Sequence, residues 1–168
     1  GIHVGFISED WGSPEFAEVV RILGELADYC AELGLLINLE TGQESADTLL
    51  HVLRTVNRDN LGVNFDPANM ILYGSGEPLE ALRKVGPYVR SCHCKDAVWS
   101  DRPGEEWGEE VPLGQGQVNI ERFVATLDEL GYTGPLTVER EVSGQRQMED
   151  IKAGLELLRS VKSKLGIA

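Results

Sequence analysis

Short β-branched runs alternate with longer segments of helical periodicity, and this alternation limits the fold more than any other feature of the chain. We expect five strands, at residues 1–7, 35–40, 61–66, 89–96 and 135–141. Strands that alternate with helices form βαβ units and a parallel sheet. The sequence therefore predicts an α/β fold of about five parallel units. These units could form an open doubly wound sheet or part of a barrel, and periodicity alone does not choose between the two.

Helix signals stand between these strands. Ser13 and Ser45 are typical N-cap residues, and Pro14 is typical of a first helical position. A turn is expected at Pro67. The expected helices run from Pro14 to about Glu32, onward from Ser45, around residues 79–85, from Asn119 to residue 131, and over about 147–165.

A polar loop from residue 97 to residue 117 exceeds the usual connection length, which favours a functional or mobile segment. No stretch has linker composition, so we expect one domain over residues 1–168.

Charge and cysteine content limit the partners. The chain has 15 Lys and Arg against 28 Asp and Glu, for a net charge of −13, and no basic stripe. Nucleic-acid binding depends on clustered cations, so it is not expected. No apolar run approaches the roughly 20 residues of a membrane span. Three cysteines, an odd number in a chain too large to need disulfides, favour a reducing cytoplasm.

Polar side chains share one face at the C-terminal end of each later strand. Residues two apart in a strand point the same way, so Glu40 lies with Asn38 and Asp66 lies with Asn64. His93 shares its face with Lys95, while Cys92 and Cys94 take the other face and are expected to pack as small hydrophobic residues. In the last strand, Glu139 and Glu141 share a face. Active sites of parallel α/β folds lie at this end.

A Glu, an Asp, a His and a Glu thus converge from four successive strands. Converging carboxylates repel one another unless a cation neutralises them, and this oxygen-rich set with one imidazole suits Mn²⁺, Mg²⁺, Co²⁺ or Zn²⁺. Taken singly, each carboxylate is more often a helix cap or a salt-bridge partner, and a lone histidine is more often a core residue. The convergence is what favours a metal site.

Four segments carry a family resemblance: INLETGQ, VNFDPANM, CHCKD and PLGQGQVNIERFVATLDELGYTGPLTVERE. They resemble the sugar phosphate isomerase/epimerase family, the xylose isomerase-like TIM barrels. The resemblance implies a divalent metal at the barrel mouth, held by Glu40, Asp66, His93 and Glu139, with Glu139 preferred over Glu141 because it sits where the family's strand ends. It also implies that Glu40 and Glu139 remove and return a proton beside the carbonyl of a small sugar or keto-sugar, through an enediolate.

Further residues are expected to bind the substrate. Asn69 stands where many members have a histidine three residues after the metal aspartate. Lys95 and Asp96 follow His93 as in many members, although a salt bridge is an equal interpretation of Lys95. Arg102 is expected to reach the mouth from the long loop.

The resemblance leaves other functions open. A lyase or dehydratase acting on a related polyol uses the same metal site, and a non-catalytic binding module keeps the fold without turnover. An abasic-site endonuclease of the same superfamily needs more metal ligands and a basic surface. It is not expected in a chain with three histidines and a net charge of −13.

The number of βα units differs from that of a whole barrel, which has eight and about 250 residues. By the resemblance, the five expected here are the fourth to eighth strands. We therefore expect either the C-terminal part of a longer protein or a half-barrel that self-associates through exposed sheet edges.

Overall fold

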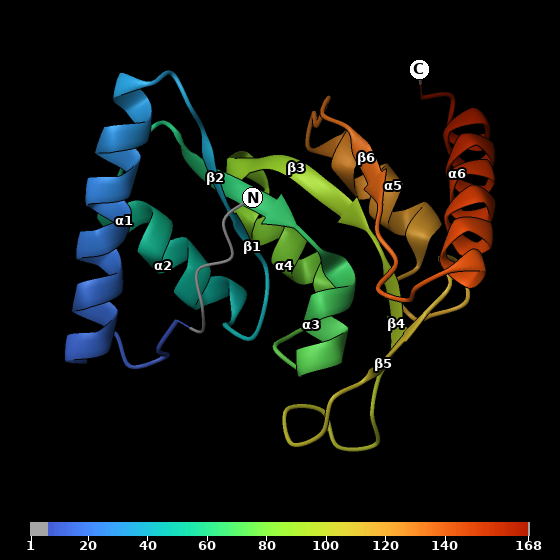
Figure 1. Cartoon of the computed structure of the whole chain (residues 1–168), viewed down its shortest axis with the longest axis horizontal. Coiled ribbons are helices and arrows are strands. Elements are labelled where there is room, and N and C mark those ends of the chain that lie inside the picture. Colours follow the sequence, from blue (N-terminus) through green and yellow to red (C-terminus); the bar gives the residue numbers. More distant parts are fainter. Residues whose placement is uncertain (1–6, 168) are drawn as a thin grey trace.

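The computed structural model describes residues 7–167 and contains one parallel sheet in the order β1–β2–β3–β6 (Figure 1). Its strands bear out four of the five expected ones, with shorter bounds at some ends. The fifth, at residues 1–7, lies outside the described residues except for Ile7. The observed strands are β1 (Ile37–Glu40), β2 (Leu61–Phe65), β3 (Val89–Cys94) and β6 (Leu136–Val138).

Five helices form a layer along this sheet, and each contacts the next in chain order. They are α1 (Pro14–Glu32), α2 (Ala46–Val56), α4 (Pro78–Val85), α5 (Ile120–Glu129) and α6 (Gln145–Leu165). In Figure 1, α1 and α2 lie at one end of the sheet and α5 and α6 at the other. The predicted N-caps are confirmed, because the hydroxyls of Ser13 and Ser45 accept the backbone N–H groups of Phe16 and Thr48. This arrangement of parallel βα units is an incomplete TIM-type barrel.

The turn predicted at Pro67 is wrong, because a sixth helix, α3 (Pro67–Tyr73), begins there. The Asp66 carboxylate accepts the backbone N–H groups of Ala68 at 2.9 Å and Asn69 at 3.1 Å. Proline at the first helical position has no N–H to lose. Asp66 followed by proline is thus a helix start, although the helix that follows is short.

The long loop after β3 contains structure of its own. The strand predicted over residues 89–96 ends at Cys94, and the chain then forms an antiparallel pair of β4 (Asp96–Val98) and β5 (Glu109–Val111). Between β4 and β5, the loop docks on α3, where Gly108 donates its N–H to Leu72 O at 2.8 Å.

The core lies between the sheet and the helices. Cys92 and Cys94 are fully buried beside Val63 and Phe65, as predicted for small hydrophobic residues. The ring of Phe65 stacks on that of Phe123 with 6.1 Å between centroids, which joins the sheet to α5. Of the helices in residues 7–167, none has the length and apolar character that crossing a membrane requires.

Candidate metal centre

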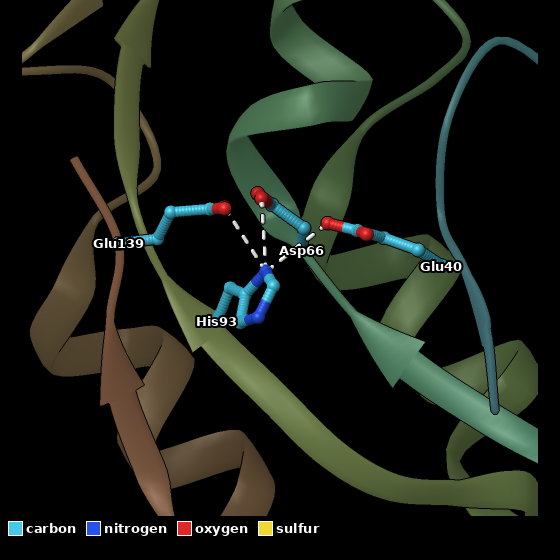
Figure 2. A group of neighbouring side chains, drawn as sticks. All are labelled: Glu40, Asp66, His93 and Glu139. Carbon is cyan, nitrogen blue, oxygen red and sulfur yellow. Dashed lines mark hydrogen bonds and ion pairs between the residues drawn. The ribbon is translucent and has the colours of Figure 1, made fainter. Parts of the chain in front are cut away.

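Four acidic and histidine side chains meet at the C-terminal end of the sheet (Figure 2). Glu40 ends β1, Asp66 follows β2, His93 lies in β3 and Glu139 follows β6. One potential ligand atom from each lies within 4.8 Å of the other three. The structure therefore brings together the four residues that the strand pattern grouped.

The imidazole occupies the middle of this group. His93 Nδ1 lies 3.0 Å from Glu40 Oε1, 3.0 Å from Glu139 Oε2 and 3.7 Å from Asp66 Oδ2. Metal–ligand bonds of about 2.0–2.2 Å allow opposite ligand atoms to lie about 4.4 Å apart, close to the observed span. The four side chains are therefore close enough together for all of them to donate to one ion.

Mutual contacts shift the pKa values of the group. Close contacts with the carboxylates of Asp66, Glu139 and Glu40 favour the charged imidazolium and raise the pKa of His93 to about 11. The contact with His93 lowers the pKa of Glu139 to about 2. Burial raises the pKa of Asp66 to about 6, although His93 and Lys95 act in the opposite direction. Without a metal, a proton on His93 therefore supplies part of the positive charge that the carboxylates require.

Two oxygens of this group fit a metal in particular. Asp66 Oδ2 and Glu139 Oε2 are buried and accept no hydrogen bond from residues 7–167. A buried carboxylate oxygen without a hydrogen bond is costly, whereas a divalent cation would satisfy it. Three carboxylates and one imidazole are also ligands that Mn²⁺, Mg²⁺, Co²⁺ and Zn²⁺ accept. The donor set and the two oxygens without a hydrogen bond both fit a divalent ion.

A hydrogen-bonded layer supports the group from below. Asn38 Nδ2 donates to Ser91 Oγ at 3.3 Å, and Ser91 Oγ donates to Asn64 Oδ1 at 2.7 Å. Asn64 Nδ2 then lies 3.3 Å from both ring nitrogens of His93. Each residue of this layer lies two positions before one of the four residues Glu40, Asp66, His93 and Glu139, which we call the metal group. Strand alternation therefore predicts where the layer lies, although only the structure shows its hydrogen bonds.

Thr41 was missed by sequence reasoning and ties the ends of β1 and β2 together. Its hydroxyl donates to Asp66 O and accepts from Asp66 N, both at 2.8 Å. Asn69, predicted to bind substrate, donates from Nδ2 to Thr41 O at 3.1 Å and to Glu40 Oε1 at 3.4 Å. These contacts make the loop after β1 and the start of α3 one supporting unit for Glu40.

Lys95, another predicted substrate-binding residue, is only 1% exposed and lies beside the metal group. Its Nζ is 2.9 Å from Glu141 Oε1. Burial would lower the pKa of Lys95, but the carboxylates of Asp66, Glu141 and Glu139 outweigh it and raise that pKa. The alternative interpretation of Lys95 as a salt-bridge partner describes these contacts. Glu141, the rival to Glu139, pairs with this lysine and lies outside the metal group.

Asp96 and Arg102, also predicted to bind substrate, make contacts within the long loop. The buried Asp96 carboxylate accepts backbone N–H groups, among them those of Gly114 at 2.9 Å and Gly116 at 3.0 Å. Arg102 is exposed and pairs with Glu105 and Glu106 of the same loop.

The chain is similar in fold and sequence to known proteins. A family model described as xylose isomerase-like TIM barrel matches residues 1–161. The crystal structure of a xylose isomerase domain protein from Planctomyces limnophilus is 51% identical, with a TM-score of 0.91, and the match covers 98% of this chain and 58% of that one. Inosose isomerase from Bacillus licheniformis is 30% identical over 132 residues, which are 73% of this chain and 46% of that protein.

A more distant structure extends the likeness in fold. A xylose isomerase-like TIM barrel protein from Mycobacterium smegmatis, solved in complex with magnesium, is 24% identical with a TM-score of 0.70. The match covers 95% of this chain and 55% of that one. The chain spans about half the length of the curated relatives it matches.

Proposed function

Because the chain belongs to the xylose isomerase-like TIM-barrel family, we propose that it carries the metal centre of a divalent-metal-dependent isomerase or epimerase. The proposed substrate is a small sugar or keto-sugar. The observation that carries this proposal is the convergence of Glu40, Asp66, His93 and Glu139 within 4.8 Å. Inosose isomerase, 30% identical to this chain, supports the reaction class.

The proposed ligands are these four residues, and the proposed acid–base pair is Glu40 and Glu139. The two glutamates extend toward His93 Nδ1 from opposite sides and each lies 3.0 Å from it (Figure 2). A carboxylate on either side of the centre is what removal of a proton by one base and its return by another requires. A bound divalent ion would supply electrophilic stabilisation of the negative charge that develops on the substrate oxygen.

Asn69 and Lys95 are proposed to line the substrate side of the centre, as the resemblance implies. Asn69 can donate a hydrogen bond to a sugar hydroxyl, but an amide is no proton donor near neutral pH. Proton movement is therefore assigned to the two glutamates. We propose no direct substrate contact for Asp96 or Arg102, since both are engaged within the loop.

Metal content tests the site. We expect the purified chain to hold about one divalent ion, and Glu40→Gln and His93→Ala to lose it. The matched controls are Glu156→Gln on the exposed side of α6 and His51→Ala, whose ring stacks on Trp11 and is not a member of the metal group. Metal analysis after gentle purification measures the metal content of the wild type and of each variant, and titration with Mn²⁺ then measures their affinity. Equally little metal in the wild type and all variants would refute the site.

The reaction class needs a separate measurement. Incubation with a panel of ketoses and related polyols in D₂O, followed by NMR, separates the candidates. Deuterium uptake beside the carbonyl supports the isomerase or epimerase, and loss of water from a polyol indicates a lyase or dehydratase. A protein that binds metal but changes no compound in the panel would behave as a binding module of the same fold.

We further propose that residues 1–168 act as one domain that self-associates through the open edge of its sheet. Within residues 7–167, β1 and β6 each pair with one strand only. Leu35 and Leu36, just before β1, are 52% and 64% exposed. Light scattering of the purified chain is expected to give a mass above that of one copy, and Leu36→Glu is expected to lower it. A monomer with a cooperative melt would contradict self-association.

A further inference from the structure

We propose that Glu141 and Asn69 hold the Lys95 ammonium away from the ligand oxygens of the metal centre. Lys95 then orders these carboxylates by its charge without occupying the position of the ion. This inference rests on the proposed function, because it concerns the same centre. It assigns Glu141 as a positioning residue that acts through Lys95.

The contacts of the ammonium fall into two classes. Lys95 Nζ donates hydrogen bonds to Glu141 Oε1 at 2.9 Å and to Asn69 Oδ1 at 3.3 Å. It lies farther from the ligand oxygens, at 3.5 Å from Glu139 Oε2 and 3.8 Å from Asp66 Oδ2. Charged N–H···O hydrogen bonds are usually about 2.7–2.9 Å long. The ammonium thus attracts the two ligand carboxylates without hydrogen bonding to them.

These more distant oxygens are the two buried ones of the metal group that accept no hydrogen bond from residues 7–167. If Lys95 donated to them directly, its N–H groups would take the lone pairs that a metal needs. It would also bring a positive charge next to the ion, at a separation where like charges repel strongly in a buried site. Restraint of the ammonium therefore favours metal binding.

The positive charge of Lys95 also balances part of the negative charge of the metal group. The three carboxylates of the metal group carry three negative charges, and they share a part-buried site with one buried ammonium. Glu141 adds a fourth carboxylate, but its side chain is 63% exposed and its charge is screened by water. The charge that remains within the metal group and the ammonium is −2, which matches one divalent ion, whereas three carboxylates alone would leave an excess negative charge after metal binding. Lys95 removes that excess, provided that it stays off the ligand oxygens.

The backbone of Glu141 is anchored although its side chain is 63% exposed. Its N–H donates to Glu110 Oε1 at 2.9 Å. Glu110, on β5, also pairs with Arg140 at 3.0 Å, and Arg140 pairs with Asp150 of α6 at 2.8 Å. The segment after β6 is thereby tied to both β5 and α6, which fixes the point from which Glu141 reaches Lys95.

A double-mutant cycle on metal affinity tests the restraint. Mn²⁺ binding is measured by titration calorimetry for the wild type, Glu141→Ala, Glu141→Gln, Lys95→Met and the double variant Lys95→Met/Glu141→Ala. We expect Glu141→Ala to weaken binding about ten-fold, the usual lower effect of removing a supporting partner of a metal ligand. Glu141→Gln is expected to recover most of it, since its amide oxygen can still accept from the ammonium.

The decisive comparison is made without the lysine. In the Lys95→Met background, Glu141→Ala is expected to change Mn²⁺ affinity no more than the charge-matched control Glu156→Ala does in the wild type. An equal loss with and without Lys95 would overturn the inference, as would unchanged affinity in Glu141→Ala. If Lys95→Met does not fold, the comparison of Glu141→Ala with Glu141→Gln decides, because equal losses would also overturn it. Failure of the wild type to bind Mn²⁺ would instead refute the proposed function.

Discussion

Asp96→Ala measures how far one buried carboxylate holds the long loop in place. Asp96 is 1% exposed. Its Oδ1 accepts the N–H groups of Ala97 at 3.0 Å and Val118 at 3.1 Å, and its Oδ2 accepts those of Gly114 at 2.9 Å and Gly116 at 3.0 Å. The carboxylate therefore joins β4 to the far end of the loop, and alanine would leave four amides without this acceptor.

The size of the effect follows from the burial of these amides. The N–H groups of Ala97 and Val118 are in buried hydrogen bonds, whereas those of Gly114 and Gly116 are part-buried and can regain water. At about 1.5 kcal/mol for each buried amide and about 0.5 kcal/mol for each part-buried one, the loss in unfolding free energy is about 4 kcal/mol. For a domain of this size, that corresponds to a fall in Tm of about 8–16 °C.

Urea denaturation followed by circular dichroism and tryptophan fluorescence measures this loss. Asp96→Asn is expected to recover less than half of it, because its amide group would face two of the N–H donors. The control is Asp101→Ala, exposed in the same loop, which is expected to change stability by less than about 0.5 kcal/mol. An equally small change in Asp96→Ala, with weaker binding of a substrate instead, would refute the anchoring role and restore the predicted substrate contact.

Three further outcomes follow from the structure. Metal binding at pH 8 is expected to release about one proton, because the pKa of His93 is raised from 6.5 to about 11 and its imidazolium must deprotonate to bind a metal. Calorimetry in buffers of different ionisation enthalpy measures the number of protons released. Metal binding without proton release would contradict the prediction. Only Cys30 is expected to react rapidly with a thiol reagent in the folded protein, since Cys92 and Cys94 are fully buried, whereas three thiols should react after unfolding. Gly74→Ala is expected to destabilise the protein by more than about 1 kcal/mol, because φ is +70° and a Cβ would clash with the backbone of Gly104. Urea denaturation measures this loss, and a stability equal to wild type would contradict both the strain and the clash.

The metal group was within reach of sequence reasoning because strand geometry narrows the candidates, and the family resemblance then favours Glu139 over Glu141. Side chains alternate along a strand, so the last polar residue of each parallel strand points to the same mouth. Glu40 and His93 lie inside strands, and Asp66 and Glu139 each follow one directly. The Asp66-Pro67 pair carried a second signal, a helix start, which the short length of α3 obscured.

The roles of Asp96 and Glu141 depend on features that no residue pattern records. Asp96 is engaged by backbone N–H groups of a loop whose path is set by tertiary contacts, and amides are present at nearly every residue. Alternation also fails beyond Val138, where β6 ends. Glu139 and Glu141 therefore need not share a direction, and only the structure shows that Glu141 turns to Lys95.

The two oxygens of the Asp66 carboxylate have different roles. Oδ1 caps the first turn of α3, and Oδ2, which accepts no hydrogen bond from residues 7–167, lies among the other proposed ligands. Because the cap holds the carboxylate in one rotamer, this ligand needs no rearrangement to receive an ion. Rearrangement of Asp66 should therefore add little to the barrier for metal entry. Where loss of water from the ion sets the rate, Mg²⁺, which dehydrates reluctantly, should arrive more slowly than Mn²⁺ whatever their relative affinities.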